Sequence, residues 1–325
     1  FGSCAAVISS SNNTINVRQL ASASLTGSDT ICEGNTASFS PIINGEPNAQ
    51  VALTWLEGST GKSGNFTLGS TPPTTFTNGI TTGALTNTTS IILQSVQYTS
   101  APACPQNLYT NAIATVTVNP TPKVTINTVN TPVCQGSTST VNYSVTGVGS
   151  STNWTLNYKV GSTSLSTSGT GAGTFNLTTP ALNASGNVDV EMVSIITTNL
   201  KTNCGSGTLS GVKLTIQVDA TTTAGSVAAD VTVCKGNSAT VTLTPGVGSI
   251  VKWNTSSSSA AGPYSSMSSS SNTFTINNIV TKLWVTATSK NGVCAEATTT
   301  TPVVIDVREL PTASISGSTT ICSGA

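Results

Sequence analysis

The residues of this chain whose type and spacing could do chemistry are its eight cysteines. They form two interleaved series that advance by about 100 residues, and by about 90 at the last step. In the first series a glycine stands two residues after each cysteine: Cys32, Cys134, Cys234 and Cys322. The second series is Cys4, Cys104, Cys204 and Cys294. Cysteines repeated in this way predict either disulfide bonds or thiolate ligands of a metal ion.

Metal binding is the less favoured of these two chemistries. No two cysteines have the Cys-x-x-Cys spacing of a zinc site, and the chain contains no histidine. We therefore expect one disulfide bond within each repeat: Cys32–Cys104, Cys134–Cys204 and Cys234–Cys294. Cys4 and Cys322 are each expected to bond with a cysteine outside this sequence. Such bonds imply folding outside the reducing cytosol, and the glycine of each Cys-x-Gly suits a turn with a positive φ angle.

Catalytic chemistry has little support in the sequence. Without histidine, neither a Ser-His-Asp nor a Cys-His nucleophile can form, and paired cysteines provide no thiolate. Asp189 and Glu191 alternate on a predicted strand and so share a face, where they are either solvated or form a calcium or acid–base site. The apolar Ile91 in another repeat favours the solvated face. We expect no enzymatic activity, and neither a metal ion nor another cofactor.

The charge of the chain excludes two classes of partner. Charged residues make up 7% of the sequence, and eleven basic residues balance eleven acidic ones. This composition has no basic stripe for nucleic acid or for an anionic membrane surface. No apolar run approaches the roughly 18 residues of a membrane span. We expect neither nucleic-acid binding nor membrane insertion of this segment.

The elements that must position the cysteines are predicted to be β-strands. Residues 138–145 and 238–244 alternate with period two, and their threonines and valines favour strands. No segment has a credible amphipathic helix pattern. Trp55, Trp154 and Trp253 recur about 20 residues after the first-series cysteines, and recurrence in register predicts core positions rather than sugar-stacking ones.

The expected fold class is all-β: a tandem array of immunoglobulin-like antiparallel β-sandwich domains with one disulfide per domain. Boundaries fall between the valine that closes each repeat and the next Cys-x-Gly. They give a fragment of a preceding domain at 1–20, complete domains at 21–120, 121–220 and 221–310, and a fragment of a following domain at 311–325. The short connectors favour a semi-rigid rod, and the cut ends indicate an internal slice of a longer polypeptide.

The order of motifs along the chain resembles a known repeat type. TVCKGNSATVTL, a tryptophan strand, TFTI, VTATSKNGVCAEA and VVIDV follow one another. This order is similar to the PKD-like, immunoglobulin-like repeats of very large Bacteroidota surface proteins, which include gliding-motility adhesins exported by the type IX secretion system. The tryptophan strands read TWLEG, NWTLN and KWNTS instead of the Trp-Asp-Phe-Gly-Asp type, so the resemblance is to PKD-like domains and not to PKD domains proper.

The resemblance implies a structural function. This segment would belong to the stalk or filament of a secreted cell-surface adhesin that serves surface attachment or gliding motility. The implied location is extracellular, after export through the periplasm. The implied partners are neighbouring repeats of the same chain, secretion or motility machinery, and surface polysaccharide. Asp29-Thr30-Ile31 is similar to the Asp-Ser/Thr-apolar sequence that some Bacteroidota O-glycosylate, which makes Thr30 a candidate glycosylation site.

Two other functions stay open. A carbohydrate- or protein-binding module would need exposed aromatic residues in one domain, and Trp284, Tyr98 and Tyr264 are the candidates. Trp284 is the first of these ligand-contact candidates because the other repeats have no tryptophan at its position, although a core role specific to its domain is the alternative. The repeats could also be the spacer of a secreted multidomain enzyme.

Overall fold

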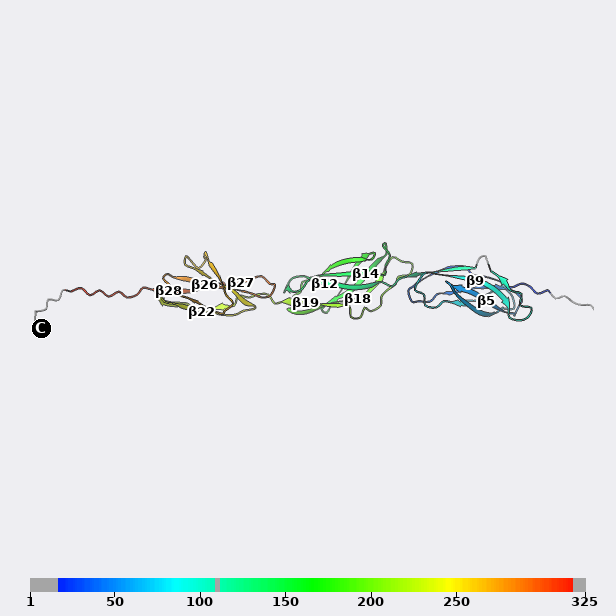
Figure 1. Ribbon diagram of the computed structural model, residues 1–325, viewed down its shortest axis with the longest axis horizontal. Helices are drawn as coiled ribbons and strands as arrows, with labels where there is room; N and C mark the ends of the chain where they lie inside the picture. The colour runs from blue at the N-terminus through cyan, green and yellow to red at the C-terminus, as the bar shows by residue number, and fades with distance from the viewer. Residues whose placement is uncertain (1–16, 109–111, 318–325) are drawn as a thin grey trace, which may run out of the picture.

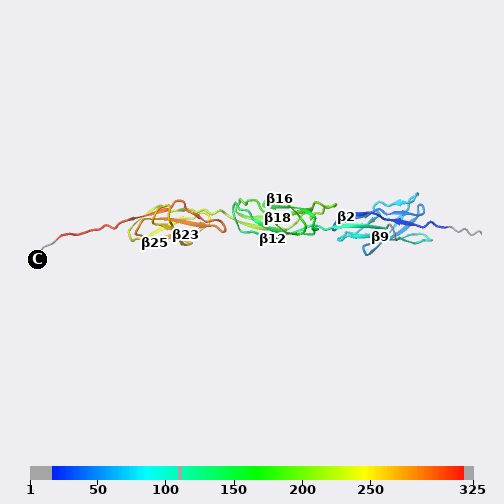
Figure 2. The same ribbon diagram turned by 90° about the horizontal axis from the view of Figure 1, so that it is seen from above.

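The computed structural model describes residues 17–108 and 112–317, and all regular structure within them is β-strand. The strands form three sandwiches that lie end to end along one axis (Figure 1). We name them sandwich 1 (22–119), sandwich 2 (123–219) and sandwich 3 (226–308). The view turned by 90° shows the same linear order (Figure 2). The predicted all-β array of immunoglobulin-like sandwiches is confirmed.

Sandwich 1 is built from two sheets that face each other. Its strands are β1 (Ser22–Ser24), β2 (Ser28–Cys32), β3 (Ser38–Phe39), β4 (Ile42–Asn44), β5 (Gln50–Glu57), β6 (Thr60–Thr67), β7 (Thr74–Thr75), β8 (Ile80–Thr81), β9 (Thr89–Tyr98), β10 (Gln106–Asn107) and β11 (Ile113–Asn119). The smaller sheet has the order β1-β4-β7, and the larger sheet has the order β2-β11-β9-β5-β6. Strand β10 pairs with β9, and β3 pairs with β8.

Sandwiches 2 and 3 repeat this topology. The strands of sandwich 2 are β12 (Lys123–Val129), β13 (Val133–Cys134), β14 (Thr140–Thr146), β15 (Asn153–Val160), β16 (Thr163–Thr170), β17 (Gly173–Thr178), β18 (Gly186–Thr197) and β19 (Lys213–Asp219). Those of sandwich 3 are β20 (Ser226–Val227), β21 (Val231–Cys234), β22 (Ala239–Thr244), β23 (Ser249–Ser256), β24 (Ser265–Ser268), β25 (Thr273–Ile276), β26 (Leu283–Lys290), β27 (Ala297–Thr298) and β28 (Val303–Arg308). Their larger sheets have the orders β13-β19-β18-β15-β16 and β21-β28-β26-β23-β24.

Each sandwich has a core of its own, produced by the period-two alternation of its strands. In β5 the side chains of Val51, Leu53 and Trp55 are buried, while the residues between them are partly exposed. Trp154 and Trp253 take the equivalent places in β15 and β23 and are fully buried. The three clusters of buried apolar side chains are each confined to one sandwich. The sandwiches therefore meet only at their ends.

The first-series cysteines lie at the C-terminal ends of the sandwiches. In each sandwich the first strand of the larger sheet runs parallel to the closing strand: β2 with β11, β13 with β19, and β21 with β28. The register places each cysteine beside the last residue of the closing strand: Cys32 by Asn119, Cys134 by Asp219, and Cys234 by Arg308. These are the points at which the chain leaves for the next sandwich.

The second-series cysteines lie at the opposite ends. Strand β9 runs antiparallel to β11 and ends at Tyr98, just before the hairpin that carries Cys104. A strand of ten residues spans about 34 Å. The two cysteines that belong to one sandwich are therefore separated by the length of its sheet.

Candidate functional site: the junctions between sandwiches

Two disulfide bonds join neighbouring sandwiches. Cys32 of sandwich 1 bonds with Cys204 of sandwich 2, with their Cα atoms 5.5 Å apart. Cys134 of sandwich 2 bonds with Cys294 of sandwich 3, with a Cα–Cα distance of 4.9 Å. In both bonds a first-series cysteine meets the second-series cysteine of the following sandwich. The junction is thus the place where the cysteine chemistry of this chain occurs.

This pairing corrects the prediction of one disulfide within each repeat. Cys104 and Cys234 have no disulfide partner among the described residues, so the expected Cys32–Cys104, Cys134–Cys204 and Cys234–Cys294 bonds are wrong. The physical reason is strand direction, because a disulfide needs Cα atoms within about 7 Å and the two cysteines of one sandwich lie at its opposite ends. Cys4 and Cys322 lie outside the described residues.

The glycine of each Cys-x-Gly has a local role at the junction. Gly34, Gly136 and Gly236 have φ angles of 85°, 85° and 86°, which confirms the predicted positive-φ turn. Their amides donate to backbone carbonyl groups across the same sandwich, at 2.8 Å in every case. This turn carries the chain from the larger sheet back towards the smaller one and leaves the cysteine at the end of the sandwich.

Hydrogen bonds accompany the disulfide at the first junction. The Nδ2 atom of Asn119, the last residue of β11, donates to the carbonyl oxygen of Thr202 at 2.9 Å. The Thr202 hydroxyl donates to the carbonyl oxygen of Thr30 at 2.8 Å. The hairpin that carries Cys204 is therefore held by both strands that end at this junction. Thr30 as a glycosylation site stays a prediction.

The second junction uses equivalent positions with different side chains. Asp219, the last residue of β19, accepts a hydrogen bond from the backbone N–H of Val293 at 3.0 Å. Asn291 donates from its Nδ2 atom to the carbonyl oxygen of Ala220 at 2.7 Å. At both junctions the last residue of the closing strand therefore contacts the hairpin that carries the bonded cysteine of the next sandwich.

The remaining predicted site residues lie away from the junctions. Trp284 is half-buried on β26, and the Nζ atom of Lys282 lies 5.5 Å from its ring centroid. A ligand contact at Trp284 stays a prediction. Asp189 accepts hydrogen bonds from Thr215 and Lys213, which together hold the pKa of its carboxyl below its ordinary value. Asp189 therefore has an ion-pair partner of its own on the neighbouring strand.

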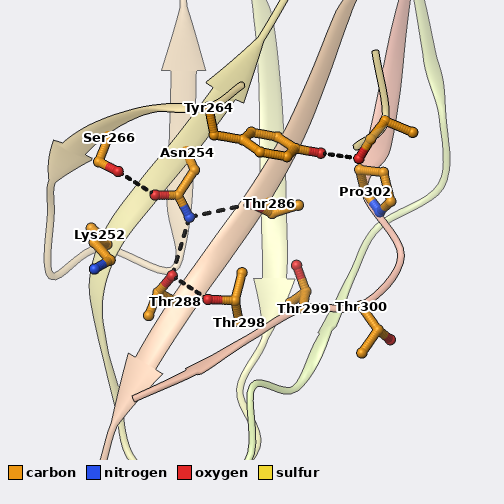
Figure 3. Close-up of a pocket in the computed structure, with 11 residues that line it drawn as sticks. Lys252, Asn254, Tyr264, Ser266, Thr286, Thr288, Thr298, Thr299, Thr300 and Pro302 are labelled. Atoms are coloured by element: carbon orange, nitrogen blue, oxygen red, sulfur yellow. Dashed lines mark hydrogen bonds between the residues drawn. The ribbon is translucent and has the colours of Figure 1, made fainter. Parts of the chain in front are cut away.

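Sandwich 3 has a second candidate site, a pocket of about 440 Å³ on its larger sheet (Figure 3). Asn254, Thr286 and Thr288 line it and alternate along β23 and β26 with the core residues Trp253 and Ala287, so they face away from the core. These three polar side chains are buried nonetheless, because the segment after β23 folds over them.

A hydrogen-bond network organises this pocket. Asn254 donates from Nδ2 to the hydroxyls of Thr286 and Thr288 at 3.2 and 3.1 Å, and its Oδ1 atom accepts from Ser266 at 2.7 Å. The Tyr264 ring lies at one side, and its hydroxyl donates to the carbonyl oxygen of Ala260 (Figure 3). The lining thus combines hydroxyl and amide groups with the Tyr264 ring and with Lys252, whose ammonium group is paired with Glu296. The sequence marks Tyr264 as an exposed aromatic but has no signal for Asn254.

Other site classes receive no support from the described part of the chain. It contains no cluster of three or more histidine, cysteine or carboxylate residues that could hold a metal ion. The described residues also contain no helix that is long and apolar enough to cross a membrane.

Comparisons with known proteins give one family match and several similar solved structures. A family model described as "Domain of unknown function (DUF8696)" matches residues 223–309. No curated protein sequence matches the chain. A solved structure of a bacterial ice-binding adhesin is 16% identical with a TM-score of 0.41, and the alignment covers 90% of this chain and 100% of that one.

Two further solved structures have similar scores. An I-band fragment of titin is 11% identical with a TM-score of 0.44, covering 91% of this chain and 100% of that one. A calcium-stabilised adhesin of an Antarctic bacterium is 11% identical with a TM-score of 0.42, covering 91% of this chain and 76% of that one. The similar structures thus include immunoglobulin-like and fibronectin-like repeat domains, with bacterial adhesins among them.

Proposed function

We propose that this chain is a structural segment of an extracellular stalk in a large bacterial surface adhesin. The observation that carries the proposal is the pair of disulfide bonds that join successive sandwiches. A crosslink within a sandwich stabilises that domain alone, whereas a crosslink between sandwiches prevents their separation under tension. Disulfides form and persist in oxidising compartments, which supports a location outside the cytosol.

The shape and chemistry of the described residues support the same proposal. The sandwiches are arranged in a line, and repetition of one unit adds length without adding chemistry (Figure 1). We extend the proposal to the finer points that the sequence resemblance implies: a PKD-like repeat type of Bacteroidota, export by type IX secretion, and a role in surface attachment or gliding. The partners would be adjacent repeats, the secretion or motility machinery, and surface polysaccharide.

Two measurements test the stalk. Antibodies against the chain should label intact cells of the organism that carries it, and protease treatment of those cells should remove the label. Small-angle X-ray scattering of the oxidised chain should give a maximum dimension that matches three sandwiches in a line. Labelling only after cell lysis, or a compact dimension in which sandwiches fold back on one another, would contradict the proposal.

The pocket of sandwich 3 supports a second candidate function, the binding of a neutral carbohydrate. The observation that favours it is the buried Asn254 amide, because the residues that follow the tryptophan in the other sandwiches are Leu56 and Thr155. Small-molecule sites combine aromatic side chains with a few placed polar groups that fix the orientation of the ligand, and this pocket offers both kinds of group.

Nuclear magnetic resonance titration with neutral oligosaccharides tests this second function. Shifts confined to sandwich 3 that disappear in Tyr264→Ala, and persist in the exposed control Met267→Ala, would support it. Equal shifts in all three sandwiches, or no shifts at millimolar sugar, would eliminate it.

A further inference from the structure

Cys104 and Cys234 occupy the same places as the four bonded cysteines. Cys104 belongs to the series of Cys204 and Cys294, and Cys234 belongs to the series of Cys32 and Cys134. A second-series cysteine is buried where a preceding sandwich covers it and is more exposed where no sandwich is described before it. Cys204 and Cys294 are 0% and 1% exposed beneath the preceding sandwich, whereas Cys104 is partly exposed.

The exposure of the first-series cysteines depends in the same way on whether a following sandwich is described. Cys32 and Cys134 are half-buried at occupied junctions, whereas Cys234 is exposed at the C-terminal end of sandwich 3. Cys104 and Cys234 are therefore cysteines in junction positions at the two ends of the array, each without a bonded neighbour among the described residues.

Arg18 shows that the end of sandwich 1 near Cys104 is built as a junction. In the sequence, NVRQL around Arg18 matches DVREL around Arg308, so Arg18 has the repeat position that Arg308 has at the end of β28. Its guanidinium group donates to the carbonyl oxygens of Ser100 and Pro102 at 2.8 Å. Those residues belong to the hairpin that carries Cys104.

Arg18 thus contacts the hairpin that carries Cys104, as the last residue of the closing strand contacts the cysteine hairpin at the other two junctions. There, Asn119 contacts the hairpin residue Thr202, and Asp219 contacts the hairpin residue Val293. The Arg18 guanidinium also lies 3.6 Å from the ring centroid of Tyr98, which orders it against sandwich 1. Arg18 consequently has the place next to Cys104 that Asn119 and Asp219 have next to Cys204 and Cys294.

The strand register then locates the partner of Cys104. In every sandwich the first-series cysteine lies beside the last residue of the closing strand. A preceding repeat would therefore bring its first-series cysteine beside Arg18, next to Cys104. At the other end Cys234 lies beside Arg308, so the hairpin of a following repeat would bring its second-series cysteine next to Cys234.

We propose that Cys104 and Cys234 crosslink this chain to a preceding and a following repeat of the same kind, which makes every junction of a longer array covalent. This inference deepens the proposed stalk function and rests on it. Each bond forms from two thiols, which lose two protons and two electrons. The electrons reduce an external disulfide, such as oxidised glutathione, to two thiols.

The proposed crosslinks create two interlaced covalent paths along the array. One path begins at Cys204 in sandwich 2 and follows about 30 residues of chain to Cys234 in sandwich 3. The proposed bond of Cys234 then connects to the repeat that follows sandwich 3. The other path begins at Cys104 in sandwich 1 and follows about 30 residues to Cys134 in sandwich 2, which is bonded to Cys294 in sandwich 3. About 30 residues reach about 100 Å when fully extended, so each path crosses two repeats by a short stretch of chain.

Tension in such an array would therefore be carried by short, already extended segments. The path from Cys104 to Cys134 includes β11 and β12, which are strands in the native structure. Unfolding of a sandwich would lengthen only chain that lies outside both paths. The array would resist extension without relying on the stability of any one core.

A chain that is extended by one repeat tests the proposal directly. Residues 312–325 match residues 22–35 in sequence, with Cys322 in the place of Cys32. A second copy of residues 36–120 added after Ala325 therefore completes a fourth repeat, whose second-series cysteine is the second copy of Cys104. Arg308 takes the place that Arg18 has before sandwich 1.

The extended chain is oxidised in a glutathione buffer, alkylated without reduction, digested and mapped by mass spectrometry. We expect a bond between Cys234 and the second copy of Cys104, while the first copy of Cys104 is alkylated. Cys234→Ser should leave the second copy of Cys104 alkylated as well. A bond between Cys322 and the second copy of Cys104, or alkylation of Cys234 in the extended chain, would overturn the proposal.

This readout is separate from the test of the stalk. Cys32–Cys204 and Cys134–Cys294 serve as internal controls in the same digest, because they report correct folding of the three sandwiches. If these two bonds form and the Cys234 bond does not, the further inference fails while the surface location and the rod shape stand on their own measurements.

Discussion

At the scale of single residues, two of the three core tryptophans donate a hydrogen bond from the indole nitrogen within the described part of the chain and the third does not. The Nε1 atom of Trp154 donates to the carbonyl oxygen of Gly171 at 2.9 Å, and that of Trp253 donates to Ser271 at 3.1 Å. The Nε1 atom of Trp55 is buried without a partner among the described residues. A buried N–H group that makes no hydrogen bond carries a desolvation cost of about 1 to 3 kcal/mol.

The tryptophans therefore differ in how well they tolerate phenylalanine. Trp55→Phe removes volume together with an unsatisfied donor, whereas Trp154→Phe removes volume and leaves the Gly171 carbonyl without its partner. We expect Trp154→Phe to destabilise its sandwich by about 1 kcal/mol more than Trp55→Phe destabilises sandwich 1. Hydrogen exchange of core amides in each sandwich measures both losses, and a larger loss for Trp55→Phe would contradict this account.

The carboxyl of Asp189 provides a second residue-scale prediction. Its pKa is lowered, first by the Thr215 hydroxyl and then by Lys213, so the ionised form is favoured in the folded state. The stabilisation is present above the unfolded pKa and is lost as pH falls through the folded pKa. Lys213→Met should move the pKa of Asp189 upward in a carbon-detected titration, while Lys282→Met in sandwich 3 should leave it unchanged. Equal effects of both variants would show that net charge, and not the local contact, sets the pKa.

At the scale of elements, strand direction decides which cysteines can meet. Because β2 runs parallel to β11 and β9 runs antiparallel to it, Cys32 and Cys104 are held at opposite ends of one sheet. The bond between Cys32 and Cys204 forms because the next sandwich begins where β11 ends. Disulfide pairing in this chain is thus a consequence of sheet topology.

Removal of one partner tests this dependence on topology. In Cys204→Ser, Cys32 and Cys104 are both unpaired, and the sequence-based pairing would now be available to them. We expect both thiols to remain alkylatable after oxidation, since the folded sheet keeps them about 30 Å apart. Peptide mapping detects the alternative, a Cys32–Cys104 bond, and its presence would mean that the sandwich can rearrange. Cys134→Ser is the matched variant at the second junction, because it leaves Cys294 and Cys234 of sandwich 3 both unpaired.

At the scale of the whole molecule, the two crosslinks shorten the path that carries force. The shortest covalent route through the chain follows residues 1–32, crosses to Cys204, returns to Cys134 and crosses to Cys294. This route contains about 130 residues, against 325 in the reduced chain. Full extension is therefore limited to roughly 450 Å when oxidised, compared with roughly 1,100 Å when reduced.

Single-molecule pulling from the two chain ends measures this limit. We expect the oxidised chain to detach at a contour length near 450 Å, and the same chain under a reducing agent to extend to more than twice that length. The double variant Cys32→Ser, Cys134→Ser should behave as the reduced chain does without any reductant. A long contour length for the oxidised chain would show that the crosslinks are absent under load.

Several features of this protein could be predicted from its sequence because they depend on local pattern. Period-two alternation predicted the strands, the recurring tryptophans predicted where each core lies, and Cys-x-Gly predicted a turn that needs a positive φ angle. The pocket of sandwich 3 could not be predicted from the sequence pattern. Its Asn254 sits on a strand face that alternation assigns to solvent, and it is buried only because a loop folds over it.

The sequence by itself determined that the cysteines recur with the repeats, and it predicted disulfide bonds, which four of the eight cysteines form among the described residues. Only the tertiary structure decided which cysteines pair, because pairing depends on the direction in which each strand crosses its sandwich. Two cysteines that are about 70 residues apart in one repeat lie at opposite ends of a sheet. Two that are 172 residues apart lie within 5.5 Å because one sandwich ends where the next begins.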